Sequence, residues 1–231
     1  MNGAHDRADT ARTTVGTVDN DDVFRRTAAN RRRAADLLAG LSPEQWRTPS
    51  LCAGWTIREL AGHLLMPMEI SVPRLLLTLV RTRGSTDLAV DVISRDLARR
   101  EPAEIVRTLR EKADQAMRVP GMGPLGPMAD SCIHLRDAAR PLGLDVTAPL
   151  DDWRIVLDFL ASTRARRGFV PAGRLTGLTL RATDQEWRSG DGPEVAGPSE
   201  ALALVMAGRP VALADLDGEG VAVLRARLGV A

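Results

Sequence analysis

Residues 51–64 read LCAGWTIRELAGHL and contain the clearest helix start in the chain. Thr56, followed three residues later by Glu59, matches the capping box, in which each side chain bonds the backbone N–H of the other residue. His63 follows in the next turn between apolar neighbours, so its side chain is expected on a face turned at least partly inward. This stretch therefore predicts a helix that begins at Thr56 and carries an imidazole toward the interior.

Helical patterns continue on both sides of this stretch. We expect helices over residues 21–41, 56–80, 101–119 and 128–142. Pro67 and Pro73 are expected to kink or break the second helix, and the glycine- and proline-rich residues 120–127 are expected to form a loop. Four helices before residue 145 favour an antiparallel bundle, an architecture that builds metal and ligand sites from facing side chains.

The pattern changes after residue 147. The remaining sequence predicts a helix, a strand, a hairpin around Ser189–Gly192 and two further helices, over residues 151–166, 175–183, 186–195, 198–207 and 221–228. We therefore expect the α+β class, with a disordered leader over 1–20, a helical bundle over 21–147 and a small α+β domain over 148–231.

The composition argues against two kinds of partner. The 31 lysines and arginines balance 30 aspartates and glutamates, and aromatic residues make up only 3%, so neither a basic surface nor stacking platforms for nucleic acid are expected. The most apolar run, Val72–Val80, is too short to span a membrane and contains Pro73 and Arg74. The leader lacks the apolar core of a signal peptide, which favours a cytoplasmic protein. We expect a monomer or a homodimer.

Two predicted helices of the bundle carry groups that can bind a metal. Asp130 and His134 are four residues apart, a spacing that places both side chains on one helix face. Together with His63 they would supply two nitrogens and one oxygen, the ligand set of an open catalytic zinc site. Two alternatives remain open. Glu59 also lies four residues from His63, and a histidine on a helix is often a core or surface residue that binds no metal.

Two further residues of the last helix in the bundle have competing interpretations. Asp137 either orients an imidazole or an arginine from behind, or it is a solvated charge paired with Arg136 or Arg140. Cys132 points about 200° around the helix from the ligand candidates, so we expect a small buried residue rather than a ligand. The two cysteines of the chain are too few for a disulfide framework and are not spaced as a zinc or redox pair.

Three ordered blocks of the sequence resemble one known family. Residues 51–64 are similar to its signature Cys-x-Gly-Trp-Thr-[Val/Ile]-Arg-[Asp/Glu]-Leu-x-x-His-Leu, and residues 134–144 are similar to its second block, His-x-x-Asp followed by Leu-Gly. Residues 178–209 resemble its second domain. This is the family of the mycothiol-dependent maleylpyruvate isomerases, actinobacterial members of the DinB-like metal-binding four-helix bundles. The resemblance covers about residues 22–228.

The resemblance implies a fold and a set of site residues. It implies an N-terminal DinB-like antiparallel four-helix bundle with a second, smaller α+β domain. The family's metal ligands fall on His63, Asp130 and His134, with aspartate at position 130 in place of the family's usual glutamate. The family also uses an arginine from the second domain. We place it on Arg209, and the competing positions are Arg174, Arg181 and Arg188.

The resemblance also implies a chemistry. Members of the family use a divalent metal, expected to be Zn²⁺, and the small thiol mycothiol as cosubstrate, and the metal-bound thiolate attacks a small electrophilic substrate. Departure of the thiol after a double bond has rotated makes an isomerase, whereas retention of the adduct makes an S-transferase. The arginine would bind a substrate carboxylate or stabilise an enolate. The alternative is a non-catalytic regulatory protein that binds a metal or a thiol ligand on the same scaffold.

Overall fold

The computed structural model describes residues 19–118 and 121–230. The predicted disordered leader lies outside the described residues except for positions 19 and 20. The N-terminal elements are α1 (Asn20–Ala39), α2 (Pro43–Trp46), α3 (Ile57–Glu69), α4 (Val72–Arg81), α5 (Thr86–Leu97), α6 (Pro102–Glu111), α7 (Leu125–Ala139) and the 3₁₀ turn η1 (Arg140–Leu142). The C-terminal elements are α8 (Leu150–Ala161), η2 (Thr163–Arg167), β1 (Thr179–Ala182), β2 (Arg188–Gly190), β3 (Glu194–Gly197), α9 (Ser199–Met206), η3 (Pro210–Asp215) and α10 (Gly220–Arg227).

The N-terminal helices form the predicted bundle. α1 packs along α6 and α7, and α3 packs against α5, α6 and α7. The apolar faces of these helices build one core, whose largest fully buried side chains include Leu60, Leu65, Ile105 and Leu135. The capping box forms at the start of α3, where Thr56 and Glu59 bond each other's backbone N–H groups.

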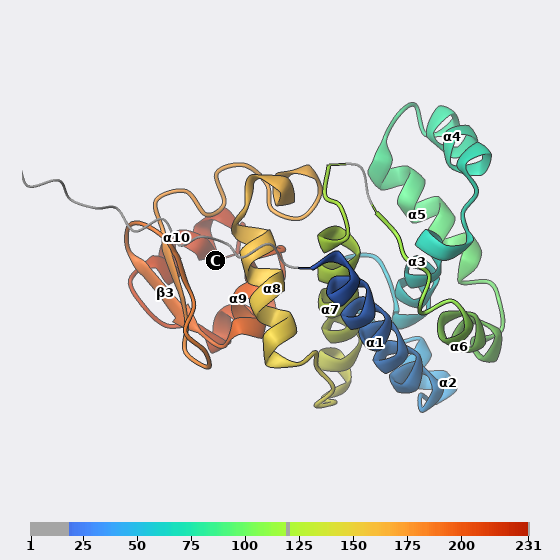
Figure 1. Ribbon diagram of the computed structural model, residues 1–231, viewed down its shortest axis with the longest axis horizontal. Coiled ribbons are helices and arrows are strands. Elements are labelled where there is room, and N and C mark those ends of the chain that lie inside the picture. Colours follow the sequence, from blue (N-terminus) through green and yellow to red (C-terminus); the bar gives the residue numbers. More distant parts are fainter. Residues whose placement is uncertain (1–18, 119–120, 231) are drawn as a thin grey trace, which may run out of the picture.

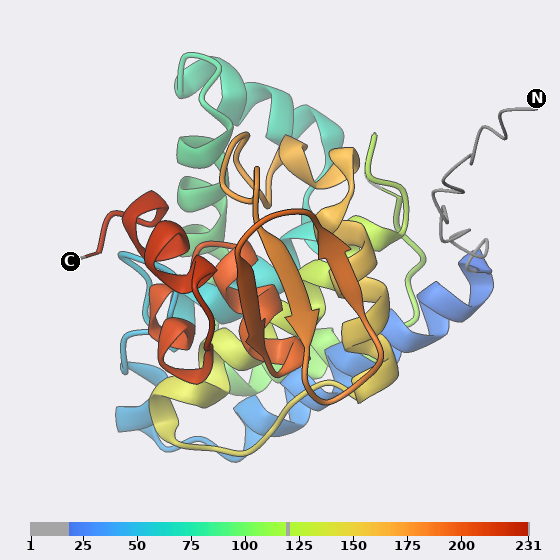
Figure 2. The ribbon, with the colours of Figure 1, turned by 90° about the vertical axis from the view of Figure 1, so that its left-hand side faces the viewer.

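A second apolar core joins α7 to the C-terminal elements. Met128 and Ile133 of α7 belong to the same cluster as Phe159 of α8, Leu204 of α9 and Leu180 of β1. Along the long axis the sheet lies at one end and α4 and α5 lie at the other, with α7, α8 and α9 between them (Figure 1). The view turned by 90° shows the strands in front of these helices (Figure 2). Because α7 contributes to both cores, almost all its residues are buried.

Several helix boundaries differ from those expected. The break expected at Pro73 is present, because the predicted helix 56–80 is divided into α3 and α4 and Ser71 caps α4 just before Pro73, whereas Pro67 lies inside α3 and does not end it. The predicted helix 101–119 ends at Glu111. The loop predicted over 120–127 is wrong at its end, because α7 begins at Leu125. Pro127 lies in the first turn of α7, where a missing N–H costs no hydrogen bond.

The predicted hairpin over residues 186–195 is also wrong. The strand order is β2-β1-β3, with β2 antiparallel and β3 parallel to β1, so the chain crosses from one side of β1 to the other. Gly190 and Gly192 make this crossing, because a Cβ atom at either position would lie within 2.3 Å of a carbonyl oxygen of residue 177 or 178. The glycines thus mark close backbone approach rather than a two-residue turn.

No helix within the described part of the chain is long and apolar enough to cross a membrane.

Gly62 sets how closely α3 and α5 approach each other. A Cβ atom at position 62 would lie 2.2 Å from the carbonyl oxygen of Ser94 and 2.7 Å from the backbone nitrogen of Ala98. Both are backbone atoms of α5 or of its C-terminal end, and they could withdraw only if the helix moved. The glycine therefore allows α5 to lie directly against the turn of α3 that carries His63.

Replacing Gly62 by alanine is expected to lower the free energy of unfolding by about 2–3 kcal/mol, because the added methyl group forces two packed helices apart. Gly40→Ala is the matched control. Its Cβ would lie 3.6 Å from the nearest atom, in an ordinary right-handed conformation, so we expect a change within about 0.5 kcal/mol. Urea unfolding measures both variants. Equal stability of Gly62→Ala and the wild type would contradict the packing constraint.

Candidate metal centre

His63 lies on the second turn of α3, and its imidazole is held from two sides. Its Nδ1 atom lies 3.4 Å from the hydroxyl of Ser94, a fully buried residue of α5. Its ring lies 5.2 Å from the ring of Trp55, whose indole N–H donates to Asp91 at 2.7 Å. The side chain of His63 is 12% exposed, and its Nε2 atom is directed toward α7. Ser94 and Trp55 therefore fix the orientation of this ring.

Asp130 and His134 of α7 complete a cluster with His63. Asp130 Oδ1 lies 3.5 Å from His63 Nε2 and 3.2 Å from His134 Nε2. The two imidazole rings are nearly perpendicular, with centroids 4.8 Å apart. Asp130 is the most open of the three, with a side chain 25% exposed. The structure thus brings together the three residues expected to be metal ligands.

The donor set fits a divalent transition metal. Ligand atoms at about 2.0–2.2 Å from a tetrahedral Zn²⁺ lie about 3.4 Å from one another. The separations around Asp130 are close to this value, and all three ligand atoms lie within 4.8 Å of one another. Three protein ligands leave a fourth position for a water or a substrate, as in catalytic zinc sites.

Electrostatics favour an ionised carboxylate in the cluster. Burial raises the pKa of Asp130, but the charges of His134 and His63 outweigh it and hold that pKa well below its ordinary value. Burial likewise lowers the pKa of His134, and the charge of Asp130 outweighs this effect and raises that pKa well above its ordinary value. A ligating imidazole is neutral, so a bound cation would take the place of this proton.

Asp137 supports His134 from behind. Its carboxylate is fully buried and lies 2.8 Å from His134 Nδ1, on the opposite side of the ring from Asp130. Arg209, which follows α9, donates to both carboxylate oxygens, from Nε at 3.1 Å and from Nη2 at 2.7 Å. The Cys52 thiol donates to Asp137 at 3.2 Å. Burial raises the pKa of Asp137, whereas His134 and Arg209 lower it, to about 2.

The structure shows where the residues with competing interpretations lie. Asp137 is not a solvated charge, and Arg136 and Arg140 pair with Glu200 instead. Glu59 is held at the helix cap by Thr56. Among the four candidate arginines, Arg209 reaches the cluster.

The other three candidate arginines make different contacts. Arg174 donates to the carbonyl oxygen of Met206, and Arg181 and Arg188 pair with Glu194 on the sheet. Cys132 is fully buried, as expected, and accepts a hydrogen bond from Asn30.

Sequence reasoning missed two residues that contact the cluster. Ser94 belongs to α5, a helix that was not predicted because its apolar residues point to two faces, with Leu88 and Val92 exposed and Ile93 buried. Cys52 is part of the 51–64 motif, but its spacing gave no sign that it would face Asp137. No local signal identifies either contact, since both depend on helix packing.

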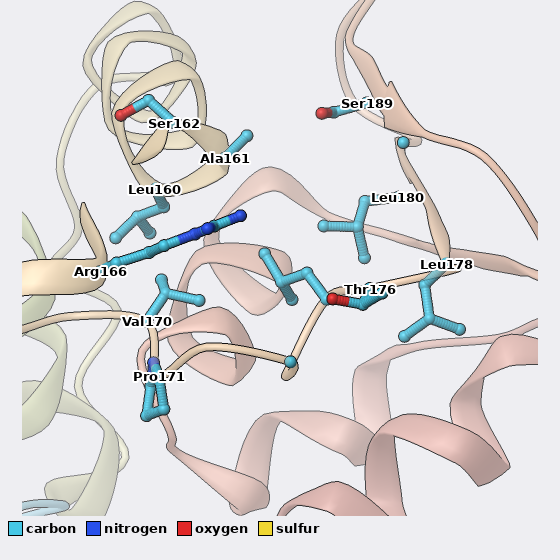
Figure 3. A pocket seen from close by; sticks show the side chains of 13 residues that line it. Leu160, Ala161, Ser162, Arg166, Val170, Pro171, Thr176, Leu178, Leu180 and Ser189 are labelled. Atoms are coloured by element: carbon cyan, nitrogen blue, oxygen red, sulfur yellow. The ribbon is translucent and has the colours of Figure 1, made fainter. Parts of the chain in front are cut away.

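A separate cavity lies between the end of α8 and the sheet. It has a volume of about 180 Å³, and apolar side chains such as Leu160 and Leu180 line it together with polar ones such as Ser162. Arg166 extends across it (Figure 3). None of the expected site residues lines this cavity, so it is distinct from the metal cluster.

Comparisons with known proteins identify the family and the fold. The model of a family described as the mycothiol maleylpyruvate isomerase N-terminal domain matches residues 27–153, more than half of the chain. A crystal structure of the mycothiol-dependent maleylpyruvate isomerase has a TM-score of 0.60 and 16% identity, covering 87% of this chain and 93% of that chain. The crystal structure of a mutant of the mycothiol-dependent maleylpyruvate isomerase has a TM-score of 0.55 and 14% identity, and it covers the same shares of the two chains. No curated protein matches the sequence. At these identities the two structures establish a shared fold.

Replacing Asp137 by asparagine is expected to lower the free energy of unfolding by about 3 kcal/mol, because Arg209 would keep a buried charge without its carboxylate. The matched control is Asp114→Asn. Asp114 is 73% exposed and pairs with Arg32 at the surface, so its loss should cost less than about 1 kcal/mol. Urea unfolding of chelator-treated protein measures both variants. Similar losses of unfolding free energy in Asp137→Asn and Asp114→Asn would show that Asp137 does not stabilise the site.

Proposed function

The chain belongs to the mycothiol maleylpyruvate isomerase family, and from this premise we propose that it is an enzyme that uses mycothiol to act on a small electrophilic substrate. The observation that supports this most directly is the convergence of His63, Asp130 and His134 on one point. Two imidazoles and a carboxylate within 4.8 Å of one another are not required by the fold, and such clusters of titratable groups are typical of functional sites. We place the reaction in the cytoplasm, where small thiols are kept reduced.

We further propose that these three residues hold one divalent metal, Zn²⁺. When bound, the metal would lower the pKa of the mycothiol thiol and keep the thiolate close to its target. The protein's own contribution is to fix the three ligands. Ser94 orients His63 and Asp137 orients His134, and such outer partners raise the basicity of a ligating imidazole.

Arg209 makes the site depend on both parts of the chain. We propose that residues 21–147 supply the metal ligands and that residues 148–231 form a smaller domain that supplies Arg209. Four of the five guanidinium hydrogens of Arg209 are used, two on Asp137, one on the carbonyl oxygen of Ala207 and one on the Cys52 sulfur. In this arrangement the main action of Arg209 is to hold Asp137, and through it His134, in place.

Metal binding is expected to respond differently to two changes at the cluster. Asp130→Glu should keep the metal, because the longer side chain can reach the same point in another rotamer. His134→Ala should weaken binding by more than the roughly 10–100-fold typical of losing an outer hydrogen-bond partner. Glu59→Gln is the matched control, because glutamine also closes a capping box and residue 59 lies four positions from His63. Titration against a competing chelator measures all three variants.

Two results would contradict this metal site. Wild-type affinity in His134→Ala would show that the ligand set is wrong. A loss of metal affinity in Glu59→Gln as large as that in His134→Ala would show that Glu59 is a metal ligand.

Catalysis is tested by mixing the metal-loaded protein with mycothiol and an electrophile. We expect conjugation of monochlorobimane or isomerisation of maleylpyruvate, and a loss of at least about 100-fold in His134→Ala, since a positioned and activated nucleophile contributes that much or more. Product analysis separates the two activities, because an isomerase releases mycothiol and an S-transferase retains it. Tight metal and mycothiol binding without turnover of either electrophile would favour a non-catalytic regulatory protein.

A further inference from the structure

The cavity between the end of α8 and the inner face of the sheet has an apolar floor. Four buried residues of the C-terminal core form this floor, namely Leu160, Val170, Leu178 and Leu180. The volume of the cavity is about 180 Å³. An apolar cavity of about 150 Å³ holds one benzene molecule. The floor can therefore receive an apolar group of about six carbon atoms.

Polar groups gather at the mouth of the same cavity. Arg166 of η2 is exposed, and the half-buried Ser162 and Ser189 lie on either side. The hydroxyl of Ser162 donates to the carbonyl oxygen of Phe159 at 2.6 Å, so its own oxygen can still accept a hydrogen bond. The cavity thus combines an apolar interior with a polar, cationic rim, which is the usual composition of a small-molecule site.

The guanidinium of Arg166 is the only charged group among the lining residues that the structure describes. Its side chain points into the cavity toward Leu180 (Figure 3), and it forms no ion pair or hydrogen bond with any described residue. The acidic residue one turn before Ser162 on α8, Asp158, already accepts the indole N–H of Trp187 at 2.8 Å. A positive charge without a counterion beside an apolar floor favours an anion that carries an apolar group.

The walls of the cavity are fixed by contacts from outside it. Arg227 of α10 donates to the carbonyl oxygens of Arg174 and Thr176, at 3.0 and 2.8 Å, and so holds the segment that forms one wall. On the opposite wall, a Cβ atom at Gly190 would lie 2.1 Å from the carbonyl oxygen of Leu178, so β2 lies directly against the neighbouring chain. A ligand that enters a preformed cavity loses less free energy to reorganisation of the protein.

We propose that this cavity is a second ligand site, which binds a small monocarboxylate with an apolar body of about six carbon atoms. The body lies on the leucine floor, and the carboxylate accepts hydrogen bonds from the planar guanidinium of Arg166. The floor selects against strongly hydrated anions such as inorganic phosphate, which would lose hydration without gaining a partner there. The proposal is independent of the proposed function, since none of the metal-ligand candidates lines the cavity.

The binding test uses benzoate in a calorimeter and benzamide as an uncharged molecule of the same shape. We expect a dissociation constant of about 0.1–1 mM for benzoate, a ligand of about nine non-hydrogen atoms, and binding of benzamide at least about tenfold weaker. Arg166→Gln should reduce the benzoate affinity to that of benzamide and leave benzamide binding within about twofold of the wild type.

Arg164→Gln is the matched control for the charge. Arg164 lies two residues earlier on η2 and is also exposed, but it does not line the cavity, so this variant should bind benzoate like the wild type.

A second variant tests the space rather than the charge. Ser189 is the cross-strand partner of Leu180, so its side chain lies on the same face of the sheet and faces the cavity. Ser189→Leu should therefore fill part of the cavity and weaken the binding of benzoate and benzamide alike, by about tenfold or more. This variant decides the matter if Arg166→Gln does not fold.

A chelator distinguishes the cavity from the metal cluster, because carboxylates also bind Zn²⁺. Benzoate affinity should stay within about twofold after chelation, and a large loss would place the ligand at the cluster and overturn the proposal. Equal affinity of the wild type for benzoate and benzamide, or unchanged benzoate binding in Arg166→Gln, would also overturn it. Arg166 would then only cover the apolar floor with its hydrocarbon stem. Absence of benzoate binding to the wild type at about 10 mM would refute the site altogether.

Discussion

The buried carboxylate of Asp137 is the interaction on which the rest of the site depends. It receives hydrogen bonds from α7 through His134, from the 51–64 motif through Cys52 and from the C-terminal elements through Arg209. A fully buried charge is tolerated only when it is paired and hydrogen-bonded, so each of these groups must be in place for the others to be stable. The same bonds set the direction of one ligand imidazole, which couples the folding of the two parts to the geometry of the cluster.

The sequence predicts those features that depend on one helix at a time. The capping box at Thr56 fixes where α3 begins, and with it the face on which His63 lies. The spacing of Asp130 and His134 fixes their common face on α7. Pro73 located the break before α4, because a proline is easily accepted in the first turn of a new helix. In each case the physical cause lies within about five residues of the feature.

The features that the sequence did not predict depend on the packing of distant segments. Ser94 reaches His63 because Gly62 lets α5 approach, and a glycine inside a helix gives no indication of its partner. Arg31 appears as one of several arginines on α1, and its burial depends on where α6 ends and exposes two carbonyl oxygens. The order of the strands depends on a close backbone approach at Gly190 rather than on a turn motif. Periodicity describes which face is buried, not what covers it.

Asp130 stands where the resemblance places the family's usual glutamate, and its side chain is one methylene shorter. Its carboxylate oxygen lies 3.2 and 3.5 Å from the two imidazole nitrogens, so the shorter side chain still reaches both rings. The charges of the cluster follow from these contacts. Asp137 is neutralised by Arg209, so the charge of Asp130 faces only the two imidazole rings. One negative charge beside two nitrogen donors that are neutral as ligands is an arrangement that favours a cation over an anion.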